Sequence, residues 1–535
     1  MSQSVEIYDT TLRDGTQQEG ISLTATDKLA VARLLDDLGV AYVEGGWPGA
    51  NPKDDEFFQR AKSELDLSHA TLTAFGSTRR KDATPEDDEQ LAALLAAETD
   101  VICLVGKSWD YHVEHALRTT TDEAVKMVAD SIEYLRSQGR RVFFDAEHFF
   151  DGYRSNRDFT LAVLKAANEA GAERIVMCDT NGGLLSHEVQ GIVGDVAETL
   201  GDATLGCHFH NDSGMAVANS ITAVLEGVYQ VQGCVNGYGE RTGNADLCSL
   251  IPNLGLKMGM ETIPKDRFEK LTTVSHHIAE IINLTLDPHL PYVGNSAFTH
   301  KAGLHTSALA RRPDAYEHMD PADVGNHTRV VVSELAGRST VVAKAEAQGF
   351  ELQPEQAQAV VDKIKELEHL GYQFEAADGS FELLLREAQG WKQDFFELES
   401  YRVFVEHIDD RVVAEATVKV YVGNERIVTT REGDGPVSAL DRALRAALID
   451  AYPELESVKL IDYRVRDLDS SDGTSARVRV LTEHSNGDDS WGTIGVHPNI
   501  IDASWKAVVE GLVLGLILSR GACLLYTSPS PRDED

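Results

Sequence analysis

Two short segments, far apart in the chain, carry the side chains with the clearest capacity for chemistry. Asp14 lies near the N-terminus, and His208 and His210 follow much later with one residue between them. Because alternate residues of a β-strand point to the same side, these two histidines would project together from one strand end. Two imidazoles and a carboxylate leave open positions around a divalent cation, as catalytic metal sites do. The alternative is a pair of partly buried histidines that only form hydrogen bonds in a loop.

The elements that would position these side chains form a repeating pattern. Short runs rich in β-branched and aromatic residues alternate with amphipathic helical stretches, such as residues 26–38 and 156–170. The eight candidate strands lie at 5–8, 41–44, 71–74, 101–105, 142–145, 174–178, 204–208 and 231–236. Eight strands alternating with helices predict an α/β fold, a (β/α)8 TIM barrel. A doubly wound open sheet is the alternative, but it usually has fewer strands and a glycine-rich turn after the first.

Polar candidates gather where the predicted strands end. In a (β/α)8 barrel the functional groups lie at the C-terminal ends of the strands. The polar residues found at or just after these ends are Arg13, Asp14, Glu44, Glu147, His148, Thr180, Asn181, His208, His210, Glu240, Arg241 and Asn244. Because the strand starts mostly lack such residues, we expect the whole set to face one mouth of the barrel.

The remaining chain predicts two further regions and a tail. We expect the catalytic barrel at 1–285, helical linker subdomains at 286–392 and an α+β regulatory domain at 393–520. The last contains an internal repeat, in which two strands precede an amphipathic helix at 414–451 and again at 475–514. This duplicated ββα unit has no catalytic-looking cluster, so binding or regulation is expected of it. Residues 521–535 break every pattern and are expected to be a non-native or disordered tail.

The composition excludes some classes of partner. The chain has 87 acidic and 49 basic residues, a formal net charge of −38, and such a field repels phosphates. We therefore expect no nucleic-acid partner and no membrane partner. The cysteines show no metal-type spacing and are expected to be buried free thiols. With no secretion signal and no apolar run of membrane-spanning length, a cytoplasmic location is expected.

Three segments carry a resemblance to a known family. Residues 9–17, 208–212 and 237–245 resemble the signatures of the acyl-CoA-condensing, metal-dependent isopropylmalate, homocitrate and citramalate synthases. The resemblance extends over the chain to about residue 520. The members that form citramalate are the most similar at residues 42–48, 144–153 and 300–305. The C-terminal repeat resembles the allosteric amino-acid-binding domain of this family.

The resemblance implies a reaction and roles for particular residues. Acetyl-CoA, pyruvate and water would give (R)-citramalate and CoA, a step towards isoleucine. A divalent cation, Mg²⁺ or Mn²⁺ with Zn²⁺ or Co²⁺ as possible substitutes, would be held by the metal ligands Asp14, His208, His210 and Asn244. Arg13 would stabilise charge on the keto oxygen and Thr180 would bind the substrate carboxylate. Glu147 and His305 would share the removal of the acetyl proton and the assistance to thioester hydrolysis.

The identity of the 2-oxo acid stays open from the sequence. An apolar wall at Leu104 would suit pyruvate, whereas Arg79 and Arg80 would suit the distal carboxylate of 2-oxoglutarate. A sister synthase acting on another 2-oxo acid and a metal-dependent aldolase or lyase of the same fold are therefore the alternatives. The resemblance further implies isoleucine as the allosteric effector and a homodimer as the assembly.

Overall fold

The computed structural model describes residues 4–300, 312, 316–331, 338–408, 411–468, 477–487 and 489–520. The chain divides into two compact units. One comprises Met1–Phe298 with Met319–Thr328, and the other comprises Thr299–His318 with Arg329–Asp535. Each unit is described by itself below.

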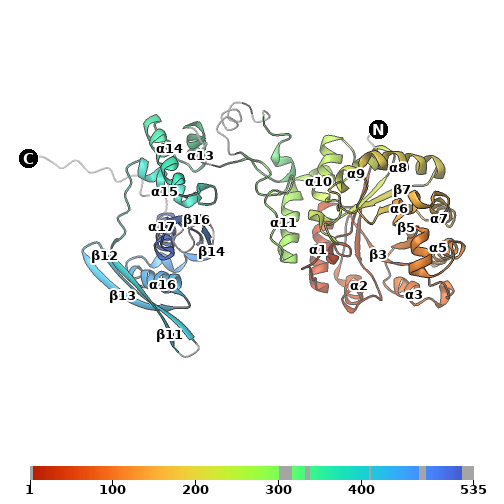
Figure 1. The fold of residues 1–535 in the computed structure, drawn as a ribbon, viewed down its shortest axis with the longest axis horizontal. Coiled ribbons are helices and arrows are strands. Elements are labelled where there is room, and N and C mark those ends of the chain that lie inside the picture. Colours follow the sequence, from red (N-terminus) through yellow and green to blue (C-terminus); the bar gives the residue numbers. More distant parts are fainter. Residues whose placement is uncertain are drawn as a thin grey trace, which may run out of the picture. The chain divides into compact units, whose positions relative to one another are not determined.

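The first unit is a closed barrel of eight parallel strands (Figure 1). The strands are β1 (Glu6–Asp9), β2 (Tyr42–Gly46), β3 (Thr71–Ser77), β4 (Val101–Lys107), β5 (Arg141–Glu147), β6 (Arg174–Asp179), β7 (Leu205–Phe209) and β8 (Gln230–Gly233). They pair in sequence order, and β8 closes the barrel on β1. The predicted (β/α)8 barrel is confirmed. The last strand ends earlier than predicted because Val235–Gly237 form a 3-10 turn in which Asn236 has a φ of 60°.

Helices surround the strands, and several of them begin at a side-chain cap. They are α1 (Ala25–Leu38), α2 (Pro52–Glu64), α3 (Glu89–Ala96), α4 (Asp110–His112), α5 (Thr121–Ser137), α6 (Phe149–Ser155), α7 (Arg157–Glu169), α8 (Ser186–Leu200), α9 (Ala216–Leu225), α10 (Leu247–Pro252) and α11 (Leu271–Ile282). Those that begin at a side-chain cap include α1, α2, α3, α5 and α7. The α1 helix shows the local rules clearly. Thr24 and Asp27 form a capping box at its start, and Gly39 adopts the left-handed conformation at its end.

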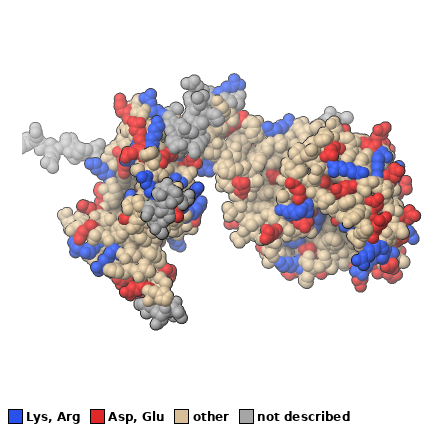
Figure 2. Space-filling model, in the orientation of Figure 1, with Lys and Arg blue, Asp and Glu red and all other residues tan. Residues whose placement is uncertain are grey.

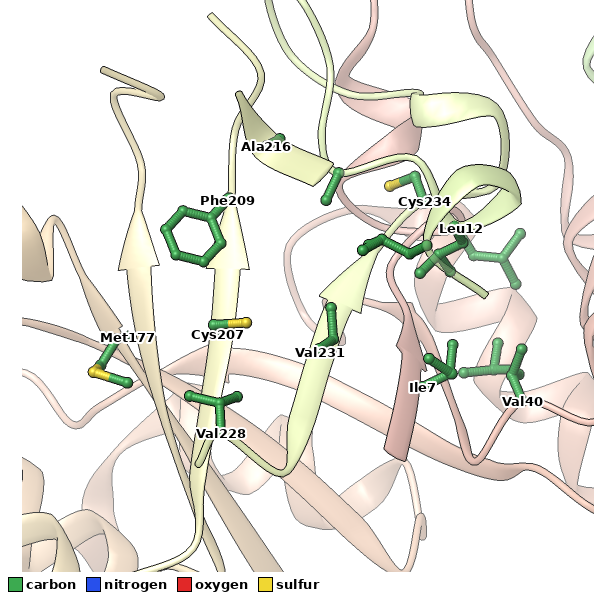
Figure 3. Close-up of a cluster of buried hydrophobic side chains, with 14 of the residues drawn as sticks. Ile7, Leu12, Val40, Met177, Cys207, Phe209, Ala216, Val228, Val231 and Cys234 are labelled. Atoms are coloured by element: carbon green, nitrogen blue, oxygen red, sulfur yellow. The ribbon is translucent and has the colours of Figure 1, made fainter. Parts of the chain in front are cut away.

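The barrel strands bury both of their faces. Alternate residues such as Ile7, Cys207, Phe209 and Val231 belong to the large hydrophobic cluster shared with the helices (Figure 3). The residues between them face the barrel interior. There a separate aromatic-rich cluster forms from Tyr8, Tyr42, Phe75, Val101, Cys103 and Phe143. The interior is thus filled by aromatic and aliphatic side chains at this level.

The second unit begins with short pieces and helices. It contains the paired two-residue strands β9 (Thr299–His300) and β10 (Arg329–Val330), and the helices α13 (Arg338–Ala347), α14 (Pro354–His369) and α15 (Asp378–Ala388). These three helices lie within the linker region that was predicted to be helical. In the barrel unit, Lys265–Lys270 form a 3-10 turn directly before α11.

The rest of the second unit is a duplicated α+β arrangement. One three-stranded antiparallel sheet, β11 (Glu397–Ile408), β12 (Arg411–Val422) and β13 (Glu425–Gly433), precedes α16 (Pro436–Leu448). A second, β14 (Lys459–Asp467), β15 (Val478–Ser485) and β16 (Ser490–His497), precedes α17 (Ile500–Ser519).

The repeating unit is therefore βββα: the two strands and the helix predicted for each copy are present, but one further strand of each copy was not predicted. The overlooked strands, β11 and β14, each lie at one edge of their sheet. Edge strands tolerate charge, and β14 reads Lys-Leu-Ile-Asp-Tyr-Arg-Val-Arg-Asp with most of its side chains exposed. That composition hides the apolar alternation by which a strand is detected. The tail predicted at 521–535 lies outside the described residues.

The surface of the described chain carries mixed charge. Figure 2 shows acidic and basic side chains interspersed over the visible faces of both units. Among the helices that the structure describes, none combines the length and the apolar character that crossing a membrane requires.

Candidate functional site

The predicted metal ligands meet at the ends of β1 and β7. Asp14 follows β1, while His208 lies in β7 and His210 directly after it. Cys207 and Phe209 belong to the outer cluster (Figure 3), so His208 faces the barrel interior. The Nε2 atoms of His208 and His210 lie 3.4 and 3.9 Å from Oδ2 of Asp14. One ligand atom from each of the three lies within 4.8 Å of the others.

Three polar atoms at this place are buried without a hydrogen-bond partner among the described residues. They are Oδ1 of Asp14, Nδ1 of His210 and Oδ1 of Asn244. Asn244 is a bridge partner of His210, and its amide nitrogen donates to the carbonyl oxygen of Tyr238. Because buried polar groups are nearly always hydrogen-bonded, a cluster of unsatisfied acceptors indicates a missing ligand. Carboxylate, imidazole and amide donors together fit a divalent cation.

The local electrostatics favour an ionised Asp14 and a neutral His210, whereas the carboxylate of Asp14 favours the protonated form of His208. Burial opposes ionisation of Asp14, but Arg13 and His208 outweigh it and hold the pKa of that carboxyl well below its usual range. Burial lowers the pKa of His210 to about 3, with a further contribution from His208. Burial also acts to lower the pKa of His208, but the bond to Asp14 reverses the effect and raises it. An anionic carboxylate and a neutral imidazole therefore face each other before any cation arrives.

Arg13 is held firmly beside Asp14. Its guanidinium pairs with the carboxylate of Glu44 and donates to Asp14 over 2.9 Å. It also lies 3.8 Å above the ring of Phe75. The hydroxyl of Tyr8 donates to the other oxygen of Glu44 over 2.6 Å. Since Glu44 is fully buried, this pair leaves Arg13 little rotational freedom at the mouth.

Glu147 and Thr180 lie in the same cavity. This cavity has a volume of about 650 Å³, and Arg13, Asp14, Glu147, Thr180, His208 and His210 are all among its lining residues. Glu147 ends β5 and pairs with Lys107 at the end of β4. The Thr180 hydroxyl oxygen accepts from the backbone nitrogen of His148 over 3.0 Å, which leaves its proton free to donate elsewhere. Of the twelve polar residues predicted to face this mouth, seven line the cavity: Arg13, Asp14, Glu147, Thr180, His208, His210 and Glu240. The other five, Glu44, His148, Asn181, Arg241 and Asn244, are not among its lining residues.

Leu104 does not lie where the substrate wall was predicted. It belongs to the outer hydrophobic cluster between the strands and the helices, and its neighbour Val105 lines the cavity instead. The alternation of β4 places 101, 103 and 105 inward and 102 and 104 outward. The prediction of Leu104 as a wall is therefore corrected to Val105. His305 lies outside the described residues.

Arg79 and Arg80, the two arginines that left a dicarboxylate substrate open, both line the cavity, but each lies close to acidic side chains. Arg79 is buried and forms ion pairs of 2.8 and 2.7 Å with Glu123 and Asp130. Arg80 is largely exposed, and its guanidinium lies 3.6 Å from Glu89. Arg79 thus has its charge compensated already, which disfavours it as the partner of a distal substrate carboxylate.

Sequence reasoning missed a layer of polar side chains below the mouth. Gln232 of β8 and Asp145 of β5 are buried, and Gln232 hydrogen-bonds both His208 and Asp145. Asp145 lies two residues before Glu147 in the same strand and so shares its face. That spacing, together with a glutamine inside a predicted strand, is the sequence feature from which this buried polar layer could have been predicted.

Comparison with known families divides the chain into three matched parts. The HMGL-like family matches residues 4–278, which hold the barrel. The homocitrate synthase post-HMGL domain-like family matches residues 292–371. The LeuA allosteric (dimerisation) domain matches residues 375–515.

Similar proteins extend over nearly the whole chain. An (R)-citramalate synthase from Aquifex aeolicus is 50% identical over 97% of this chain and 98% of its own length. An (R)-citramalate synthase from Streptomyces coelicolor is 52% identical over 97% of each protein. A probable 2-isopropylmalate synthase from Methanopyrus kandleri is 32% identical over 96% of this chain and 98% of its own length. The chain therefore belongs to the HMGL-like family, in the group of isopropylmalate, homocitrate and citramalate synthases.

Proposed function

We propose that this chain is an (R)-citramalate synthase, which condenses acetyl-CoA with pyruvate and water to give (R)-citramalate and CoA. The observation that carries the proposal is its identity of about 50%, over nearly the full length, with proteins of that name. The cavity adds support, because it brings Arg13, Glu147 and Thr180 to the same mouth as the candidate metal ligands.

A divalent cation fits the unsatisfied donors at the end of β7. Asp14, His208, His210 and Asn244 would hold it, and Mg²⁺ or Mn²⁺ suits this oxygen-rich set best, with Zn²⁺ or Co²⁺ as alternatives. When bound, such a cation polarises a keto group as a Lewis acid. The protein residues described next do the remaining work.

Arg13 and Thr180 suit the binding and activation of a 2-oxo acid. The guanidinium of Arg13, fixed by Glu44, is a preorganised donor for the negative charge that develops on the keto oxygen. The Thr180 hydroxyl, whose oxygen already accepts from His148, has a proton to donate to the substrate carboxylate. Fixed donors of this kind stabilise the transition state without reorganising during the reaction.

Two proton transfers remain, and we assign them to Glu147 and His305. A base must take a proton from the acetyl methyl group, and a second group must assist attack of water on the thioester. Glu147 is the candidate at the described mouth, where the ammonium of Lys107 holds its carboxylate. His305 enters through the family resemblance, and we leave the division between the two roles open.

Pyruvate is the 2-oxo acid that the cavity walls favour. Val105 and Phe75 supply apolar surface beside Arg13, which suits a methyl group. A 2-oxoglutarate site needs an additional cation, and Arg79 is already paired with Glu123 and Asp130. Burying a second carboxylate without a partner is costly.

A thiol-release assay tests the reaction directly. The full-length protein is incubated with Mn²⁺, acetyl-CoA and pyruvate, 2-oxobutyrate, 2-oxoisovalerate or 2-oxoglutarate in turn. We expect pyruvate to give the highest kcat/KM and 2-oxoglutarate the lowest. Faster turnover of 2-oxoisovalerate than of pyruvate would contradict the proposed substrate.

For regulation we propose isoleucine as the effector and a homodimer as the assembly. The LeuA match supports both an allosteric and a dimerising role for residues 375–515. An effector of a committed step is expected to be the end product of its route. Isoleucine titrated into the thiol-release assay should inhibit, and leucine or valine at equal concentration should inhibit far less. Stronger inhibition by leucine would contradict this choice of effector.

A further inference from the structure

His208 is the one candidate metal ligand whose far ring nitrogen has a buried protein partner. His208 and Gln232 are register partners on the neighbouring strands β7 and β8, so their side chains share a face. The Nδ1 atom of His208 lies 3.0 Å from Oε1 of Gln232. The Nε2 atom of Gln232 in turn donates to Oδ1 of Asp145 over 3.0 Å. All three side chains are buried, with at most 4% of each residue exposed.

The donors and acceptors of these groups fix the direction of both hydrogen bonds in this series. The Asp145 oxygen accepts, so it holds the amino group of the Gln232 amide on its own side. The amide oxygen is therefore turned towards His208, and because it can only accept, the proton of the imidazole must sit on Nδ1. A neutral imidazole with its proton on Nδ1 has its lone pair on Nε2. That atom faces Asp14.

His210 provides the contrast within the same site. Its Nδ1 atom is buried and has no hydrogen-bond partner in the described part of the chain. Among the residues that the structure describes, none holds Nδ1 of His210 as Gln232 holds Nδ1 of His208. Of the two histidines, only His208 has a partner for its Nδ1 atom among the described residues, so only its ring orientation and tautomer are set by a described side chain.

We propose that Gln232, held by Asp145, is a positioning residue that sets the tautomer and ring orientation of His208 for a divalent cation. The inference rests on the metal site of the proposed function. Partners behind a metal-ligating histidine tune its basicity and orientation, and their removal typically weakens metal affinity by about 10- to 100-fold. Gln232 is not itself among the residues that line the cavity, and it reaches the site only through His208 and Asp145.

The experiment measures Mn²⁺ binding to the full-length protein by isothermal titration calorimetry. Gln232→Met keeps the side-chain length and neutrality but removes the acceptor, so the Kd should rise by about 10-fold or more. Gln230→Met is the matched control, since Gln230 is also fully buried and lies two residues earlier on the same face of β8. Gln230 bonds Glu6 rather than a metal ligand, and its variant should bind Mn²⁺ within about twofold of the wild type.

Two further variants separate the hydrogen bond from packing. Gln232→Glu keeps an acceptor for Nδ1 of His208, so its Kd should stay closer to the wild type than that of Gln232→Met. Gln232→Asn keeps a buried amide but is too short to bridge His208 and Asp145, and it replaces Gln232→Met if that variant does not fold. Its Kd should rise in the same way.

The outcomes distinguish this inference from the proposed function. If the wild type binds no divalent cation, the metal site itself fails. If the wild type binds Mn²⁺ and releases thiol, but the Met or Asn variant binds equally tightly, the positioning role is overturned. A Glu variant as weak as the Met variant overturns it as well, because the acceptor would then be irrelevant.

Discussion

Buried polar atoms without partners occur in both units of this molecule, but they are arranged differently. At the barrel mouth they belong to Asp14, His210 and Asn244, which lie together beside a cavity. In the second unit both ring nitrogens of the buried His484 lack a partner among the described residues. Yet His484 stacks on Trp491, and the backbone of Gly511 approaches its ring so closely that no side chain would fit there. An unsatisfied histidine therefore indicates a site only where several such groups converge on open space.

The two units also differ in what their strands expose. The barrel strands bury their large apolar side chains on both faces. The sheets of the second unit leave eight such residues exposed: Leu398, Phe404, Val405, Val412, Tyr421, Val428, Ile461 and Val465. Exposed apolar sheet surface of this kind is typical of a protein–protein interface. On the proposed function, the buried polar groups of the barrel would serve chemistry, whereas the exposed apolar groups of the second unit would contact a partner.

Removal of a metal ligand tests this contrast most severely. His208→Ala should reduce metal-dependent thiol release by about 10³-fold or more, because the cation contributes several kcal/mol to charge stabilisation. His484→Ala removes an equally buried imidazole from the second unit and should leave bound Mn²⁺ unchanged. Metal content after dialysis, measured by mass spectrometry, checks both variants. Equal metal loss in the two would break the distinction between converging and isolated histidines.

The anchoring of Arg13 gives the next largest effect. Glu44→Gln removes the charge that compensates the buried guanidinium, and breaking such a pair costs about 3 kcal/mol or more. We expect a lower midpoint of thermal unfolding and a fall in kcat of about 10- to 100-fold, as for loss of a preorganised donor.

The control for this prediction is Glu123→Gln. It affects a similar arginine pair, but Glu123 is more exposed, so stability should change by less than about 1 kcal/mol and kcat should not change. If Glu44→Gln also leaves kcat intact, then Glu44 serves stability alone and the mouth does not depend on a fixed Arg13.

The sequence sufficed for the architecture because several barrel strands, such as β4 and β5, contain an apolar run with a polar residue at its end. The same property concealed other details. All five residues of 101–105 are apolar, so nothing in the sequence distinguishes the inward Val105 from the outward Leu104. The edge strands β11 and β14 were overlooked because charge interrupts their alternation. A polar residue at the end of a strand can be recognised from the local sequence. Which residues of a fully buried strand face the barrel interior cannot be recognised in this way.

The partner of His208 could not be predicted for a different reason. Gln232 reaches it through the register between β7 and β8, and Asp145 comes from β5. Register and barrel closure are long-range properties that arise from the packing of all strands. A sequence therefore indicates which residues ligate a metal more readily than which residues orient them.

The exposed apolar surface of the second unit predicts an effect on assembly. Val405 of β11 and Ala414 of β12 pair across the sheet, and Val405 is 55% exposed. Val405→Asp should weaken the proposed dimer by about 10-fold or more, since a buried unpaired carboxylate opposes association. Sedimentation equilibrium measures the dissociation constant. Arg431→Asp, at an exposed polar position of the same sheet, should leave it within about threefold; an equal loss there would implicate charge rather than the apolar surface.

The smallest predicted effect concerns two buried ionisable groups of the second unit whose pKa values shift in opposite directions. Burial raises the pKa of Glu510 to about 7, so its contribution to stability is complete at low pH and is lost as the pH rises towards 7. Burial lowers the pKa of His484 to about 4, so its contribution is complete above its usual pKa and is lost as the pH falls. Between about pH 4.5 and 6.5, the two groups change the free energy of unfolding with pH in opposite directions, and their effects nearly cancel.

Substitution of one group at a time should reveal the pH dependence of the free energy of unfolding that the other group causes. In Glu510→Gln only the histidine slope remains, so the free energy of unfolding should fall by about 2 kcal/mol as the pH drops from about 6.5 to 5. In His484→Phe, which keeps an aromatic ring against Trp491, it should fall by a similar amount as the pH rises over the same window. Calorimetry of the full chain measures the free energy of unfolding of both variants. The transition of the second unit is identified as the one that the barrel substitution His208→Ala does not shift. A flat profile in both variants would mean that neither group is held in its uncharged form by burial, and that His484 is less enclosed than the histidines of the barrel mouth.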